Sequence, residues 1–191
     1  MRILSIDFDY FVDADMQTRT QCFPDGNDSK FTTDDWKYFY NTYPHLKDIG
    51  IIKNDYDYMC ELLRGLKGVP CLVSDTHKDM EKLFRYVSEE EDLELINVDF
   101  HHDMFVTGGN SLDCGNWLRF LVDLKPNANI TWVRREDSDV NSLFGEFPYR
   151  HTTDIKEIKE NFDYVFLCFS SPWSPPHLYE KFVKMCDSIL R

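Results

Sequence analysis

Acidic and imidazole side chains follow three short apolar runs of this chain, at the point where each run ends. They are Asp7 and Asp9 after residues 3–6, Asp75 and His77 after residues 71–73, and Asp99, His101 and Asp103 after residues 93–98. Charged groups that close a buried strand are costly unless something compensates their charge. The carboxyl ends of strands in an open α/β sheet meet at one edge, where ligands bind. The sequence therefore predicts one crevice that collects these side chains around a cation.

The order of apolar and amphipathic segments predicts the fold class. The expected strands are residues 3–8, 71–73, 93–98, 130–133 and 164–169. The expected helices are residues 34–43, 55–66, 77–87, 115–124 and 175–190. Strands that alternate with helices predict a mostly parallel sheet covered on both faces, a three-layer α/β/α fold. We expect a single domain over residues 1–191, in which residues 13–35 form a long, polar, functional loop with a turn signal at residues 24–27.

Composition and charge narrow the class of partner. The formal net charge is −13, and no cluster of lysine and arginine is long enough to form a basic groove. Nucleic acid is therefore not an expected partner. An acidic field concentrates cationic ligands or peptides, although the alternative interpretation is that the acidity only aids solubility.

Cysteine usage and hydropathy indicate the compartment. The six cysteines are scattered without a Cys-x-x-Cys pair, which excludes a zinc ribbon. No apolar run approaches the length of a membrane span, and the first residues do not resemble a signal peptide. We expect a reduced, cytoplasmic protein that does not bind membranes.

The candidate metal ligands are two imidazoles and four carboxylates. They are Asp7, Asp9, His77, Asp99, His101 and Asp103. A sulfur-free, carboxylate-rich set favours Mn²⁺ over a structural Zn²⁺. Six side chains exceed what one catalytic ion takes from protein, whereas a pair of ions about 3.5–4 Å apart would use them all. Asp75 is the nearest competitor of His77 and is expected to form hydrogen bonds behind the ligands.

The same segments resemble the arginase (ureohydrolase) superfamily. That family carries a histidine after one strand, Asp-x-His-x-Asp after the next and Ser-x-Asp-x-Asp after another, and these six side chains hold two manganese ions. Here the corresponding segments are residues 73–77, 99–103 and 5–9. Cys114-Gly115-Asn116 is similar to the family's Ser-Gly-Asn segment, which contacts the substrate. The alternative for Asn116 is that it caps the helix that follows.

The chain also departs from the arginases, and the departures resemble one branch. The Ser-x-Asp-x-Asp element comes first instead of last, as in a circular permutation, and the chain is much shorter. Trp117-Leu118 stands where arginases carry a proton-shuttling histidine, so we expect the rim that holds a free amino acid to be rebuilt. We find no equivalent of the glutamate that pairs with the guanidinium. Asp-x-His-His-Asp, the early Asp-Phe-Asp and the closing Ser-Ser-Pro-Trp-Ser-Pro-Pro resemble the peptide arginases.

The resemblance implies a reaction and roles for the residues. Peptide arginases convert arginine to ornithine, with release of urea, in ribosomally made precursor peptides, so such a peptide is the implied partner. Asp7 and Asp99 would be shared between the ions. His77 and Asp103 would complete one site, and His101 and Asp9 the other.

Three residues are candidates for the proton transfers of this reaction. Asp103 would take a proton from the nucleophile. His102 is the first candidate for protonating the leaving amine, because histidine titrates in the right range, and His151 is the second. Two other functions stay open: a small-molecule guanidine or amidine hydrolase of the same fold, and a non-catalytic, metal-stabilised protein-binding domain.

Overall fold

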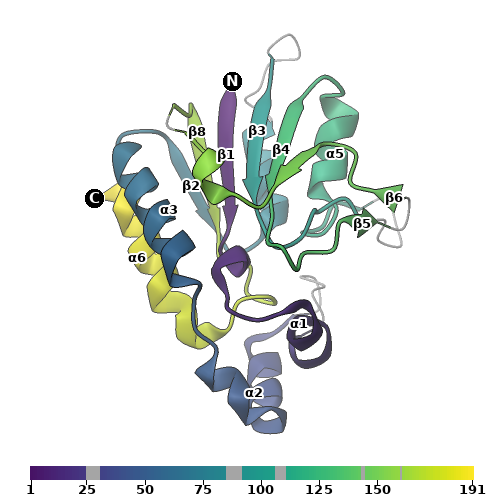
Figure 1. The fold of residues 1–191 in the computed structure, drawn as a ribbon, viewed down its shortest axis with the longest axis vertical. Coiled ribbons are helices and arrows are strands. Elements are labelled where there is room, and N and C mark those ends of the chain that lie inside the picture. The colour runs from purple at the N-terminus through teal and green to yellow at the C-terminus, as the bar shows by residue number, and fades with distance from the viewer. Residues whose placement is uncertain (25–30, 85–91, 106–110, 143–144, 160) are drawn as a thin grey trace.

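The computed structural model describes residues 1–24, 31–84, 92–105, 111–142, 145–159 and 161–191. Within these residues, six parallel strands form one sheet in the order β2-β8-β1-β3-β4-β7 (Figure 1). The strands are β1 (Arg2–Asp7), β2 (Cys71–Ser74), β3 (Glu94–Val98), β4 (Asn129–Val133), β7 (Arg150–Thr152) and β8 (Tyr164–Cys168). Ile6 pairs with Val98 on one side and with Leu167 on the other, so the carboxyl ends of these three strands lie at one level.

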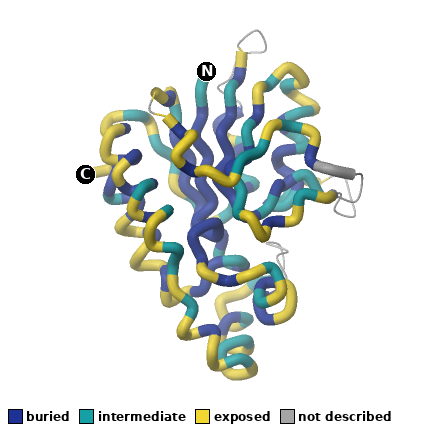
Figure 2. Tube along the Cα trace, viewed as in Figure 1, coloured by how far each residue is buried: buried dark blue, intermediate teal, exposed yellow. Residues whose placement is uncertain are grey.

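Helices cover both faces of the sheet, because successive side chains of each strand point to opposite faces. On one face, α3 (Lys53–Gly65) and α6 (Tyr179–Leu190) pack together over Leu4 and Ile6 of β1. On the other face, Ile3 belongs to a second core. That core is covered by η3 (His77–Met80), α4 (Glu81–Phe84) and α5 (Trp117–Leu124). The central strands β1, β3 and β8 are buried except at their first residues, which is visible in Figure 2. The predicted three-layer α/β/α class is therefore confirmed.

A helical segment lies beyond the carboxyl ends of the strands (Figure 1). It contains η1 (Phe8–Phe11), α1 (Met16–Cys22), α2 (Thr33–Thr42) and η2 (Pro44–Asp48). The prediction that residues 13–35 form a loop is wrong where α1 lies. Asp15 caps α1 by accepting a hydrogen bond from the Thr18 N–H, and only Arg19 and Cys22 of this helix are buried. Such a helix has no apolar stripe to reveal it. Residues 25–27 of the turn signal lie outside the described residues.

Other predicted elements differ in detail. The strand β7 and the short hairpin β5 (Asn141–Ser142) with β6 (Gly145–Glu146) were not expected. The helix predicted over residues 77–87 begins as the 3₁₀ turn η3 and continues as α4 to Phe84, and its last residues lie outside the described part. The closing helix likewise begins with a 3₁₀ turn, η5 (Pro176–Leu178), and a further one, η4 (Ile155–Glu157), precedes β8. No helix among the described residues is long and apolar enough to cross a membrane.

Candidate metal centre

All six predicted ligands meet beyond the carboxyl ends of β1, β2 and β3. Asp7 ends β1 and Asp9 lies in η1, while His77 begins η3 after β2. Asp99, His101 and Asp103 follow β3. Five of the six residues are buried, and the side chain of His101 is 15% exposed. Parallel strands with aligned ends thus bring together groups that are far apart in sequence.

Local hydrogen bonds explain why alternate residues face the same way at two strand ends. The Asp7 carboxylate accepts a hydrogen bond from the Asp9 N–H at 3.0 Å, and the Asp99 carboxylate accepts one from the His101 N–H at 2.8 Å. Such bonds from an aspartate to the backbone two residues on are a common way to turn a chain. The strand therefore bends as it ends, and the side chains at positions i and i+2 converge.

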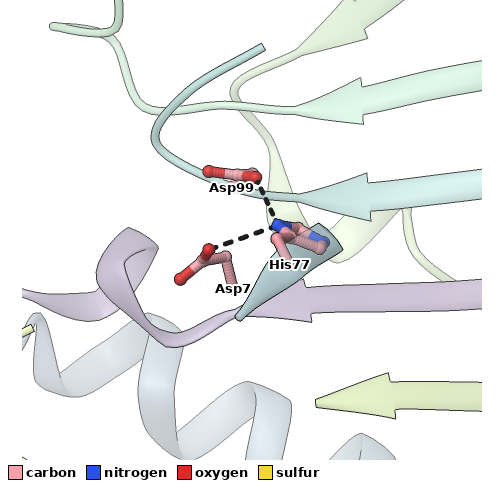
Figure 3. Close-up of side chains that lie close together, drawn as sticks. All are labelled: Asp7, His77 and Asp99. Atoms are coloured by element: carbon pink, nitrogen blue, oxygen red, sulfur yellow. Dashed lines mark ion pairs between the residues drawn. The ribbon is translucent and has the colours of Figure 1, made fainter. Parts of the chain in front are cut away.

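Three carboxylates surround one nitrogen of His77. Its Nδ1 lies 3.2 Å from Asp7 Oδ2 and 3.1 Å from Asp99 Oδ2 (Figure 3). Asp103 Oδ2 lies 3.2 Å from the same nitrogen. None of the three oxygens is placed to accept a hydrogen bond from this Nδ1, which is a buried polar atom without a partner. On the other side of the ring, Nε2 lies 2.7 Å from the Ser5 hydroxyl, which fixes the orientation of the imidazole.

Asp99 faces both histidines of the cluster. Its Oδ2 lies near His77, and its Oδ1 lies 4.0 Å from His101 Nδ1. His101 Nδ1 in turn lies 2.9 Å from Asp9 Oδ2. Among the described residues, the potential ligand atoms form two groups, each within 4.8 Å: Asp7, His77 and Asp99, and Asp9, Asp99 and His101. Asp99 belongs to both groups, so it would be shared between them if each group held an ion.

The electrostatics of the cluster favour a cation. Burial raises the pKa of Asp7 to about 7, and Asp9 and Asp99 add to this rise by repulsion. Burial also raises the pKa of Asp99 well above its usual range, again helped by neighbouring carboxylates, and that of Asp103 to about 6. These shifts mean that the carboxylates are poorly compensated by protein groups alone.

A divalent ion would supply the missing charge. Besides His77 Nδ1, the buried Asp9 Oδ2 also lacks a hydrogen-bond partner. Unpaired oxygen and nitrogen atoms in a buried, carboxylate-rich cluster are what a hard or borderline metal ion binds. The residues present therefore fit one or two divalent ions.

Trp117 and Leu118 lie in the core. Both side chains are fully buried, so neither of them lines a substrate-binding rim, and the expectation that the rim is rebuilt stays a prediction. The Trp117 Nε1–H donates a hydrogen bond to Asp103 Oδ2, and its ring lies 4.5 Å from that of His77. Asp103 has a φ of 49°, a conformation that residues other than glycine rarely adopt. Trp117 thus supports two candidate ligands from behind.

His102 lies among aromatic rings. Its ring centroid is 4.2 Å from that of Phe105, and Trp132 and Phe147 also contact it. Its Nδ1 accepts a hydrogen bond from the Met104 N–H, and no ion pair joins it to the described carboxylates. Burial lowers the pKa of His102 to about 4, so the ring is neutral at pH 7. A role as proton donor stays a prediction, while the hydrogen bond from Met104 shows that His102 braces the turn that contains Asp103.

The remaining candidates lie around the cluster. Asn116 is buried at the start of α5, and its side chain accepts a hydrogen bond from the Asp113 N–H and donates one to the Ser111 carbonyl. These bonds brace the loop before α5 without capping the helix. Asp75 accepts a hydrogen bond from the Ser171 hydroxyl. His151 accepts one from Arg134 Nε and contacts Trp132.

Arg19 is a residue of the site that sequence reasoning missed. Its guanidinium is buried, lies 3.9 Å from the centroid of Phe100, and has Nη1 at 3.7 Å from Asp9 Oδ2. It donates hydrogen bonds to the carbonyls of Asp9, Val12 and Ala14. Burial alone would raise the pKa of Asp9, but His101 and Arg19 lower it below its usual value. Nothing in the sequence of the polar helix α1 indicates this contact.

Comparisons with known proteins identify no relative. No protein-family model matches the chain, and no curated protein and no solved structure matches it either. The cluster itself and the sequence motifs that form it are therefore the features that bear on function.

Proposed function

We propose that this protein is a dimanganese hydrolase that converts peptidyl arginine to ornithine, with release of urea, in the maturation of ribosomally made peptides. The observation that carries the proposal is the buried cluster in which Asp99 faces both His77 and His101. A sulfur-free set of carboxylates and imidazoles favours manganese. The reaction and the substrate come from the resemblance of the three motifs to peptide arginases.

Each part of the cluster has a task in this reaction. A guanidinium is a stable cation and a poor electrophile, and the ions supply Lewis acidity and hydroxide at neutral pH when they are bound. Asp99 holds the two ligand groups at a fixed separation, and Ser5 orients His77. Trp117 holds the Asp103 carboxylate in place by a hydrogen bond, and Asp103 would accept the proton of the nucleophile.

The reasons for a peptide substrate are fewer than the sequence indicated. Trp117 and Leu118 are not at a rim, and part of the 13–35 stretch is helix α1. The net charge of −13 still favours a cationic peptide, and the branch-specific motifs support the same substrate. Two alternative functions are a small-molecule guanidine hydrolase and a non-catalytic binding domain. The following two experiments distinguish them from the proposed function.

The first prediction concerns the metal. We expect elemental analysis after manganese loading and desalting to give about two ions per chain, because the cluster contains two ligand groups. Asp9→Ala should reduce this to about one, since Asp9 belongs to one group only. The matched control is Asp13→Ala, an exposed aspartate of the same segment, which should keep both ions. One ion or fewer in the wild type, unchanged in Asp9→Ala, would remove the dinuclear proposal.

The second prediction concerns the substrate. In mass spectrometry, an arginine-containing peptide should lose the mass of CN₂H₂ on incubation with the manganese-loaded protein. Free arginine at the same concentration should release less urea. Added salt should slow the reaction of the peptide more than that of free arginine, since salt screens the attraction between a cationic peptide and the acidic protein. Equal or faster turnover of free arginine would indicate a small-molecule ureohydrolase. No turnover of either substrate by a protein holding two ions would indicate a binding domain.

A further inference from the structure

The accessible side of the cluster is next to an indole. His101 is the one candidate ligand of the six that is not buried, and the Trp173 ring lies beside it with centroids 4.5 Å apart and planes tilted by 51°. Trp173 is itself partly exposed. A substrate that approaches the cluster from the side of His101 therefore meets Trp173.

The turn that carries Trp173 is held in place by several contacts. The N–H groups of Trp173 and Ser174 both donate to the Ser170 carbonyl, at 2.8 and 2.9 Å. Ser170 has a φ of 56°, and the Ser171 carbonyl accepts a 2.7 Å hydrogen bond from the indole of Trp36. Prolines at positions 172 and 175 further restrict the backbone. The backbone that carries Trp173 is therefore held in place before any ligand binds.

The same turn holds a carboxylate. The Ser171 hydroxyl donates to Asp75 Oδ1, which joins the loop after β2 to the turn after β8. Asp75 is exposed, and no ion pair compensates it among the described residues. An indole face attracts a delocalised planar cation such as a guanidinium, and a nearby unpaired carboxylate adds to that attraction.

We propose that Trp173 and Asp75 form a subsite that receives the guanidinium of the substrate on its way to the metal centre. Trp173 contributes its ring face, and Asp75 contributes its charge. The proposal deepens the proposed function and rests on it, because the ligand class is the guanidinium of that reaction. It assigns a role to two side chains that lie outside the set of metal ligands.

Steady-state kinetics of the manganese-loaded protein test the subsite. Trp173→Leu should raise KM for an arginine-containing peptide about 3- to 30-fold, the range of a cation–π contact, with kcat within about 2-fold. Trp173→Phe keeps a ring against His101, and its KM should lie between that of Trp173→Leu and that of the wild type. Asp75→Asn keeps an oxygen for Ser171 and should also raise KM. Tyr38→Leu and Asp34→Asn, at exposed positions of α2, are controls that should change nothing.

A neutral ligand separates charge recognition from general apolar contact. The inhibition constant of the same peptide with citrulline in place of arginine should change little in Trp173→Leu. The metal content of each variant is also measured, so that a loss of affinity caused by displacement of His101 is recognised. If Trp173→Leu loses metal, the Trp173→Phe variant, which keeps a ring beside His101, is used to test the subsite.

The outcomes distinguish this inference from the proposed function. An unchanged KM in Trp173→Leu with full metal content would overturn the subsite while the hydrolase proposal stands. An equal loss of affinity for the arginine and the citrulline peptides in Trp173→Leu would also overturn the subsite. If the wild type does not hydrolyse the arginine peptide, the hydrolase proposal fails. Direct titration then shows whether arginine binds more tightly than citrulline and whether Trp173→Leu removes that difference, and the absence of either effect overturns the subsite.

Discussion

Asp99→Ala should lose both manganese ions and all measurable turnover, while the protein still folds. Asp99 is the carboxylate that faces both histidines, with one oxygen 3.1 Å from His77 Nδ1 and the other 4.0 Å from His101 Nδ1. Its removal therefore breaks both ligand groups, whereas Asp9→Ala breaks one. Without metal, the buried Asp99 is repelled by Asp103 and Asp9. The fold should therefore tolerate its loss.

Three measurements on the same samples test this prediction. Elemental analysis reports metal content, mass spectrometry reports ornithine formation, and circular dichroism reports folding. Asp99→Asn is a second variant that keeps the volume and an acceptor for the His101 N–H but removes the negative charge. We expect it to fold as the wild type does and to be inactive. Activity of Asp99→Ala equal to that of the wild type would refute the metal-dependent mechanism.

Arg19→Met should destabilise the metal-free protein by about 3–5 kcal/mol, the usual effect of removing one partner of a buried ion pair. The change removes the guanidinium beside the Asp9 carboxylate. It also removes the hydrogen bonds that Arg19 donates to the carbonyls of Asp9, Val12 and Ala14. For a chain of this size, such a loss lowers the melting temperature by roughly 6–20 °C. Manganese should reduce this loss of stability, because an ion bound to Asp9 compensates the negative charge that Arg19 compensates in the metal-free protein.

Urea unfolding with EDTA and with manganese measures both effects. Arg150→Met is the matched control, since Arg150 forms an exposed ion pair with Glu157 and should change the free energy of unfolding by at most about 1 kcal/mol. If Arg19→Met behaves like Arg150→Met in the absence of metal, Arg19 has no structural role at Asp9. Arg19→Lys keeps the charge but not the planar set of donors, and we expect it to recover only part of the stability.

The positions of the candidate ligands could be predicted from the sequence because they depend on a general property of parallel sheets. Asp7 and Asp99 directly follow apolar runs that are long enough to form strands. Parallel strands in register end at one edge, so residues about 90 positions apart become neighbours. The three-layer class follows from the same alternation of strands and helices. Neither prediction requires knowledge of where any side chain points.

Elements without an apolar pattern could not be predicted. Strand β7 consists of Arg150, His151 and Thr152, and its extended conformation is stabilised by pairing with β4. Helix α1 buries an arginine and a cysteine and has no apolar stripe. Their formation depends on partners that are distant in the chain, and local propensity carries little information about such partners.

Side-chain roles around the cluster were decided by the tertiary structure. His102 is next in sequence to two candidate ligands, yet its ring packs against Phe105 and Trp132, which come from other segments of the chain or from beyond the turn. Trp117 was singled out only because it replaces a histidine, and the structure places it in the core, where it donates a hydrogen bond to Asp103. The sequence alone determined which residues reach the edge of the sheet, through the period and order of its strands. Only packing in three dimensions decided which of them face the cluster, because side-chain direction depends on neighbours contributed by other segments of the chain.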